Sequence, residues 1–297
     1  MQHIEICSRA KVNFTLEVGA RRADGYHEID SVAQVIDLSD RLVVERAPDG
    51  VIEVLVDEGG APEGPENLVY KACEAFFRAA GIAGGARFVL RKGIPVQAGL
   101  GGGSGNAAAA AVALDTLWGT GFSEEKLCEI ASSVSSDAGL FVVGGTTRLG
   151  GRGELIRPLP DAPEMHLVVV KPEVGVSTSW AYAELDKRAP HVRRGAGERA
   201  ERAVRNADRE ALIASFWNDF DRMVADALPE VKEAKGLLAA AGAERAMLCG
   251  SGSAVFGVFD SERGARSAAE TARDRFAQVF VTRTLSRAES RGVLFCR

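Results

Sequence analysis

The sequence predicts an α+β fold, in which strands and helices are mixed but do not follow one another as repeated βαβ units. Apolar and polar residues alternate through residues 4–18, which is typical of a strand. Residues 32–56 contain three more short strand-like runs. Three prolines stand within residues 158–163 and mark a domain boundary, so we expect domains at residues 1–157 and 158–297.

Turn and cap residues place the elements of the first domain. Asp24 and Gly25 form the tip of a turn. Asn67 is a good cap for a helix at residues 68–80, and Ser123 is a good cap for a helix that runs to about residue 132. The other expected elements are strands at residues 32–38, 41–46, 51–56, 87–92, 140–143 and 146–149, and an apolar, buried helix at residues 106–118.

The second domain is expected to follow a β-α-α-β order with further elements after it. Residues 166–171 form a continuous apolar strand. Charged helices fill residues 178–241, with a polar break near residues 189–197. Residues 246–248 and 254–259 are strands on either side of a second glycine cluster.

Composition narrows the class of protein. The 297 residues carry a net charge of −5, which disfavours a nucleic-acid partner. The five cysteines include no C-x-x-C pair and the four histidines have no metal-ligand spacing, so we expect reduced thiols and no metal ligated by these side chains alone. The N-terminus lacks a signal-peptide core and no run of 18 apolar residues occurs. We therefore expect a cytoplasmic protein, without a membrane partner.

Residues 95–105 are the most informative segment, because five of the eleven are glycine and the expected apolar helix follows at once. Such a segment is not a stable helix or strand interior, so we expect a loop whose free N–H groups, with the adjoining helix N-terminus, bind phosphate. A flexible linker is the alternative, but a linker would not join directly to an apolar helix. No Gly-Lys-Ser/Thr follows, and Ser104 stands where a dinucleotide fingerprint requires glycine.

Four other features are candidates for chemistry, and each has a structural alternative. Asp137 borders an apolar stretch, where burial would tune a carboxylate for proton abstraction, or it caps a helix. Lys11 lies in an apolar strand pattern and either stabilises phosphate charge or faces solvent. Tyr26 and His27 suit stacking on a base, or they pack within their loop. Residues 250–253 form either a second backbone wall around a ligand or a tight β-turn.

Several of these segments together resemble the GHMP kinases. Residues 95–108 are similar to the phosphate-binding motif of that family. The branch that acts on CDP-methylerythritol is resembled more closely still, over about residues 4–260, through the segments at residues 10–16, 22–28, 145–154, 171–178 and 249–257. The sequence Asp-Gly-Tyr-His at residues 24–27 is the most specific part, because other GHMP kinases lack it.

The resemblance implies transfer of the γ-phosphoryl group of ATP, with Mg²⁺, to the 2-hydroxyl of the methylerythritol part of a CDP-linked substrate, a step of the non-mevalonate route to isoprenoids. It also implies two α+β domains with the active site between them. The N-terminal domain would contain a left-handed βαβ unit, and the C-terminal domain would be ferredoxin-like. The partner would be a small-molecule substrate, and the chain a monomer or homodimer.

The resemblance also assigns roles to residues. Asp137 would be the general base, and Lys11 would lie near both that carboxylate and the reacting hydroxyl. Asn13, Tyr26, His27, Thr178 and Tyr182 would bind the substrate, with the cytosine held by Tyr26, His27 and Tyr182. The ATP-phosphate loop would consist of Pro95, Val96, Gln97, Ala98, Gly99, Leu100, Gly101, Gly102, Gly103, Ser104 and Gly105.

The chain departs from the family pattern in three places. It has Ser-Gly-Asn at residues 104–106, where the family has Ser-Ser-Asp or Ser-Ser-Asn, and Ala-Gly-Leu-Phe at residues 138–141, where the family has Val-Pro-Phe-Phe. Residues 186–210 are charge-rich and have no evident motif. One alternative is a GHMP kinase for another small alcohol, such as homoserine or mevalonate, which would not need Tyr26 and His27. Another is a non-catalytic nucleotide-binding protein, which should have lost Asp137 or Lys11.

Overall fold

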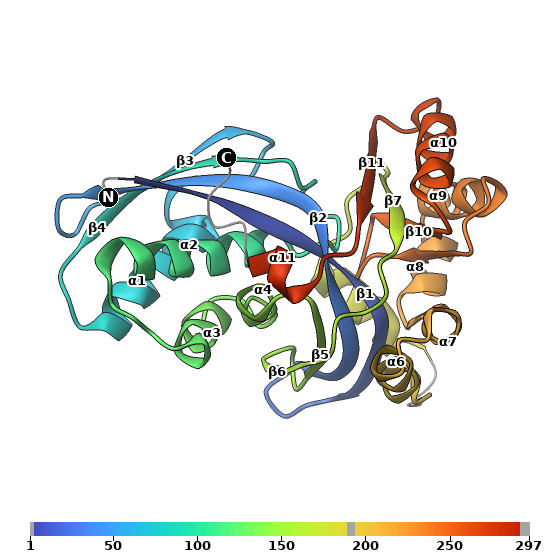
Figure 1. Cartoon of the computed structure of the whole chain (residues 1–297), viewed down its shortest axis with the longest axis horizontal. Helices are drawn as coiled ribbons and strands as arrows, with labels where there is room; N and C mark the ends of the chain where they lie inside the picture. The colour runs from blue at the N-terminus through green and yellow to red at the C-terminus, as the bar shows by residue number, and fades with distance from the viewer. Residues whose placement is uncertain (1–2, 189–193, 292–297) are drawn as a thin grey trace.

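The computed structural model describes residues 3–188 and 194–291 and contains two β-sheets with helices packed on them (Figure 1). The larger sheet has seven strands and contains the path β3-β4-β2-β1-β8, with β5 paired to β2 and β6 paired to β5. The smaller sheet has four antiparallel strands in the order β11-β7-β10-β9. The predicted α+β class is confirmed.

A long antiparallel hairpin, β1 (His3–Arg21) and β2 (His27–Ala47), forms the centre of the larger sheet (Figure 1). The two strands expected at residues 32–38 and 41–46 are one strand, so the predicted break between them was wrong. Asp40 does not turn the chain there. Its carboxylate is fully buried and accepts hydrogen bonds from the backbone N–H groups of Gly93 and Ile94, both at 2.8 Å.

The strands β3 (Ile52–Glu58) and β4 (Gly85–Arg91) pair in parallel and are joined through α1 (Leu68–Ala80), which makes a βαβ unit. The left hand expected for this unit stays a prediction. A short 3₁₀ turn, η1 (Gly64–Glu66), precedes α1. The predicted cap of α1 is confirmed, because the side chain of Asn67 accepts a hydrogen bond from Val69 N at 2.9 Å.

Three further helices follow β4 along the chain: α2 (Gly102–Trp118), α3 (Glu124–Ser132) and α4 (Gly139–Val143). Two predictions fail here. The apolar run at residues 140–143 is a helix and not a strand, because a short apolar run looks alike in both structures. The helix α2 begins at Gly102, so four residues of the expected glycine loop form its first turn. Ser104 and Gly105 in this turn are buried, and their packing offsets part of the entropy cost of glycine.

The smaller sheet has the strand order of a ferredoxin-like domain, as expected. Its strands are β7 (His166–Lys171), β9 (Arg245–Leu248), β10 (Val255–Phe259) and β11 (Gln278–Arg283). The remaining elements are β5 (Thr146–Gly150), β6 (Leu155–Pro158), α5 (Thr178–Asp186), α6 (Ala196–Arg205), α7 (Arg209–Ala214), α8 (Asp221–Ala227), α9 (Pro229–Ala240), α10 (Glu262–Arg273) and α11 (Arg287–Arg291).

One short strand, β8 (Trp217–Asn218), was not predicted from the sequence. It lies in the second half of the chain but pairs in parallel with β1, so both halves contribute to the larger sheet. The predicted domain boundary at residues 157 and 158 falls at the end of β6 and stays a prediction. Of the predicted polar break, residues 189–193 lie outside the described residues.

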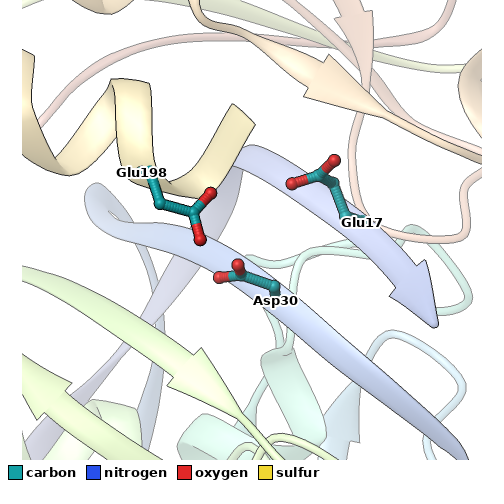
Figure 2. A group of neighbouring side chains, drawn as sticks. All are labelled: Glu17, Asp30 and Glu198. Carbon is teal, nitrogen blue, oxygen red and sulfur yellow. The ribbon is translucent and has the colours of Figure 1, made fainter. Parts of the chain in front are cut away.

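Three carboxylates lie close together where α6 meets β1 and β2 (Figure 2). Glu17, Asp30 and Glu198 offer carboxylate oxygens that all lie within 4.8 Å of one another. Glu17 accepts a hydrogen bond from Ala196 N at the start of α6, at 3.0 Å. The guanidinium of Arg148 donates two hydrogen bonds to Asp30, at 2.9 and 2.7 Å, and one to Glu198, at 2.9 Å. Each of the three carboxylates therefore has a hydrogen-bond donor, from Arg148 or from the start of α6, so the cluster is explained as a structural contact.

Cys73, Cys128 and Cys249 are free thiols, as expected. Cys7 is disulfide-bonded, so the expectation of a reduced thiol was wrong for this residue, and Cys296 lies outside the described residues. Spacing along the sequence does not report which cysteines approach each other in space. Among the described residues, no helix is long and apolar enough to cross a membrane.

Candidate active site

A cavity of about 1030 Å³ brings together nearly all of the predicted site residues. It is lined by Lys11, Asn13, Tyr26, His27, Asp137, Thr178, Tyr182 and every loop residue from Pro95 to Ser104. Gly105 is the exception, because it does not line this cavity. A Cβ on Gly105 would lie 2.7 Å from the carbonyl oxygen of Arg9 and 2.8 Å from Ser8 Oγ, so this residue faces β1.

The glycine loop leads directly into the N-terminus of α2. Gly99 and Gly101 have φ angles of +74° and +73°, which only glycine adopts readily. Gly101 is also the N-cap of α2, and no side chain caps this 17-residue helix. Gly101, Gly102 and Gly103 line the cavity, so the N-terminal end of the helix, with its free N–H groups and positive dipole end, lies at the cavity wall.

The second glycine cluster packs directly against the first loop. Gly252 N donates to Cys249 O at 2.8 Å, so the segment is a tight turn. Gly250 and Ser251 also line the cavity, so it is a wall of the site as well. A Cβ on Gly99 would lie only 1.9 Å from Cys249 O, which shows how closely the two backbones approach.

The buried side chain of Lys11 lies beneath the loop. Its Nζ donates a hydrogen bond to Asn13 Oδ1 at 2.7 Å, and Asn13 Nδ2 donates to Ser31 Oγ at 2.8 Å. Burial lowers the pKa of the Lys11 ammonium, while the carboxylate of Asp137 opposes this shift. Lys11 therefore does not face solvent, and its partners on β1 and β2 fix its direction.

Asp137 precedes α4 and connects to the loop through hydroxyl groups. Ser135 Oγ lies 2.8 Å from Ser104 Oγ and donates to Asp137 Oδ1 at 3.3 Å. This chain joins the phosphate loop to the carboxylate. Sequence analysis missed Ser135, and its position two residues before Asp137 was the only signal for it.

Aromatic side chains form the far end of the cavity. The rings of His27 and Tyr182 stack with centroids 5.1 Å apart, and His27 Nε2 lies 2.8 Å from Asp186 Oδ1. Burial, together with the carboxylate of Asp137, raises the pKa of Tyr182 to about 12, so its phenol stays neutral. Tyr26 is 55% exposed and lines the cavity, and the guanidinium of Arg152 lies over its ring.

Thr178, at the start of α5, lies with its Oγ1 3.3 Å from Ser251 Oγ, so this residue faces the second glycine turn. Sequence analysis also missed Asn106, Arg152 and Asp186, which line the cavity. Asn106 is 3% exposed, and its Oδ1 has no hydrogen-bond partner within the described part of the chain. A buried amide oxygen without a partner is a ready ligand for a cation or a donor from a bound molecule.

The geometry therefore combines an anion-binding helix N-terminus, a buried lysine, a carboxylate and a ring-lined end in one cavity. An anionic group bound at the loop would lie near Lys11 and Asp137, and a flat ring would fit beside Tyr26 and His27. Positioning and charge neutralisation of this kind are what phosphoryl transfer requires.

Comparison with known proteins agrees with this site. Family models for the GHMP kinases match the chain twice, with the N-terminal domain at residues 67–145 and the C-terminal domain at residues 198–278. A solved structure of 4-(cytidine 5'-diphospho)-2C-methyl-D-erythritol kinase superimposes with a TM-score of 0.77 and 33% identity, covering 94% of this chain and 98% of that one. A homoserine kinase from Cytophaga hutchinsonii, 18% identical, shares the fold with a TM-score of 0.78 over 96% of this chain and 95% of its own.

Two curated relatives, both named 4-diphosphocytidyl-2-C-methyl-D-erythritol kinase, match almost from end to end. The Pelotomaculum thermopropionicum protein is 41% identical over 95% of this chain and 98% of its own, and the Moorella thermoacetica protein is 39% identical over 96% and 100%. Fold and site thus define the chain as a GHMP kinase. Within that class, it belongs to the family of 4-diphosphocytidyl-2-C-methyl-D-erythritol kinases.

Proposed function

We propose that this chain transfers the γ-phosphoryl group of ATP to the 2-hydroxyl of 4-diphosphocytidyl-2-C-methyl-D-erythritol, in the non-mevalonate route to isoprenoid precursors. The observation that carries the proposal is the single cavity that holds the glycine loop, Lys11, Asp137 and the Tyr26–His27 pair. The names of the full-length relatives support the choice of substrate.

The reaction needs a base, an anion site and a charge-stabilising cation. In the proposed step, Asp137 accepts the proton of the 2-hydroxyl as that oxygen bonds to the γ-phosphorus. The bond to the bridging oxygen breaks, and ADP leaves with the electron pair. The Lys11 ammonium stabilises charge on the reacting oxygens, and the first N–H groups of α2 hold the phosphates of ATP.

Mg²⁺ fits the donor set beside the loop. Ser104 Oγ and the unpartnered Oδ1 of Asn106 are oxygen atoms at the N-terminal end of α2, and Mg²⁺ prefers oxygen ligands. We propose that these two residues hold the ion together with the ATP phosphates. When bound, the ion would neutralise phosphate charge.

The proposed acceptor extends from the base towards the aromatic end of the cavity. The cytosine would lie between Tyr26 and Tyr182, with His27 forming a hydrogen bond to it. Asn13, which is fixed by Lys11 and Ser31, would contact the methylerythritol part. Thr178 would contact the substrate from α5. The protein would act in the cytoplasm on this small molecule, without nucleic acid, as a monomer or homodimer.

The second candidate is a GHMP kinase for another small alcohol, such as homoserine or mevalonate. Product analysis separates the two. The purified chain is incubated with ATP, Mg²⁺ and CDP-methylerythritol, and the product is analysed by mass spectrometry and phosphorus NMR. We expect a mass gain of one phosphoryl group on the methylerythritol part. An unchanged CDP-methylerythritol beside phosphorylated homoserine or mevalonate would establish the second candidate.

A further inference from the structure

The turn that joins β5 to β6 contacts both ends of the cavity. Gly153 N donates to Gly150 O at 3.0 Å, which closes the turn. On one side, Ile29 N on β2 donates to Gly151 O at 2.8 Å. On the other side, a Cβ on Gly153 would lie 3.6 Å from the Cβ of Asp137. The turn therefore lies between Asp137 and the strand that begins with His27.

Arg152, in the middle of this turn, directs its side chain to the cavity. It lines the cavity, and its Cζ lies 4.7 Å from the centroid of the Tyr26 ring. Within residues 3–188 and 194–291, no carboxylate forms an ion pair with this guanidinium. Arg22 differs, because it is paired with Asp24 and Glu28.

A half-buried arginine without an acidic partner at a cavity wall is suited to bind an anion of the ligand. The guanidinium presents its N–H groups as a planar fork that fits two phosphate oxygens at once. The cation–π contact with Tyr26 restrains this fork, which lowers the entropy that binding would cost. Arg21 adds a second cation nearby, since it lines the cavity and its Nε donates to Gly25 O at 3.3 Å.

We infer that Arg152 binds the diphosphate of the acceptor substrate, an inference that rests on the proposed function. In a CDP-linked alcohol, the diphosphate lies between the pyrimidine and the reacting hydroxyl. The turn of Arg152 lies between the residues proposed for those two ends, Tyr26 and Asp137. Arg152 thus distinguishes a nucleoside diphosphate-linked acceptor from a short alcohol without a phosphate group.

The test compares ligands that differ only in their phosphate groups. Binding of cytidine, CMP and CDP is measured by calorimetry, without ATP, for the unchanged protein, Arg152→Gln and Arg152→Lys. We expect Arg152→Gln to weaken CDP about tenfold, the usual effect of one charged hydrogen bond, and cytidine less than twofold. Arg152→Lys should recover part of the loss, because it keeps the charge but not the fork.

Arg87→Gln is the matched control, because this arginine is exposed and paired with Glu53 between β3 and β4, outside the cavity lining. It should bind all three ligands as the unchanged protein does. Equal losses of cytidine and CDP in Arg152→Gln would show that Arg152 only supports Tyr26, and no loss would remove it from the site. Either result overturns the inference and leaves the proposed function standing. If the unchanged protein binds neither cytidine nor CDP, the proposed substrate is wrong, and the role of Arg152 fails with it.

Discussion

The close contact between the two glycine segments leads us to a specific prediction for the substitution of Gly99 by alanine. In Gly99→Ala, the new methyl group would lie 1.9 Å from Cys249 O, so the two segments must separate by more than an ångström. The φ angle of +74° adds strain of about 1–2 kcal/mol for a residue with a side chain. With overpacking of about 1–3 kcal/mol, the total cost to the native loop is about 2–5 kcal/mol.

We expect this cost to change the kinetic constants for ATP. A displacement of about 1 Å at a reacting centre typically lowers the rate about 100-fold. We therefore expect Gly99→Ala to raise the KM for ATP at least about tenfold and to lower kcat, as measured by ADP release at varied ATP concentration.

Gly119→Ala is the matched control for backbone strain. Gly119 ends the same helix with a φ angle of +65°, but a Cβ there would meet no atom within 4 Å. The Gly119→Ala substitution should lower the free energy of unfolding by about 1 kcal/mol and leave the kinetic constants for ATP unchanged. If Gly99→Ala and Gly119→Ala have the same KM for ATP, the packing of the second turn does not shape the nucleotide site, and the reasoning is refuted.

Three further predictions follow from charges in the structure. Asp137→Asn should fold and bind ATP but lose at least about 100-fold in kcat, measured by ADP release, and near-normal turnover would exclude it as the base. Because the pKa of Lys11 is lowered, kcat should begin to fall at a pH below the pKa of an ordinary lysine, and a fall only at or above that pKa would contradict this. Lys11→Met should keep the fold but lose activity at every pH. Hydrogen bonds from Arg157, Arg148 and Arg205 lower the pKa of Glu201, so its contribution to stability is present above about pH 4.5 and is lost as the pH falls through the lowered folded-state pKa. Glu201→Gln should therefore lower the melting temperature at pH 7 and flatten its decrease in acid, and equal acid profiles would contradict this.

Local signals predicted several elements well. The caps at Asn67 and Ser123 give the starts of α1 and α3, because a side-chain cap acts within a few residues and is visible in sequence. The glycine loop likewise predicts an anion site from the sequence, and the φ angles above zero at Gly99 and Gly101 are ones that glycine adopts readily.

Features that depend on distant parts of the chain were not predictable in this way. Asp40 looked like a turn residue, but it is a buried carboxylate that holds Gly93 and Ile94 from 53 and 54 residues away. The strand β8 is only two residues long and exists because β1 lies beside it. Tertiary contacts override local preference in both cases.

The residues of the candidate site likewise include some that could be predicted from the sequence and some that could not. Lys11, Tyr26, His27 and Asp137 could be chosen from the sequence through the family resemblance, but their gathering in one cavity could not. Ser135 lies in no matched segment, and Arg152 lies in the matched segment at residues 145–154 without an assigned role, because their importance comes from what their side chains approach.

The central claim is that this cavity phosphorylates a CDP-linked alcohol, and one measurement tests it most directly. Coupled ADP release is followed with CDP-methylerythritol, homoserine and mevalonate as separate acceptors at equal concentrations. We expect CDP-methylerythritol to give a kcat/KM at least about 1,000-fold above the other two, because they lack the pyrimidine and diphosphate that the far end of the cavity would bind. No ADP release with CDP-methylerythritol, together with turnover of homoserine or mevalonate, would contradict the proposed function.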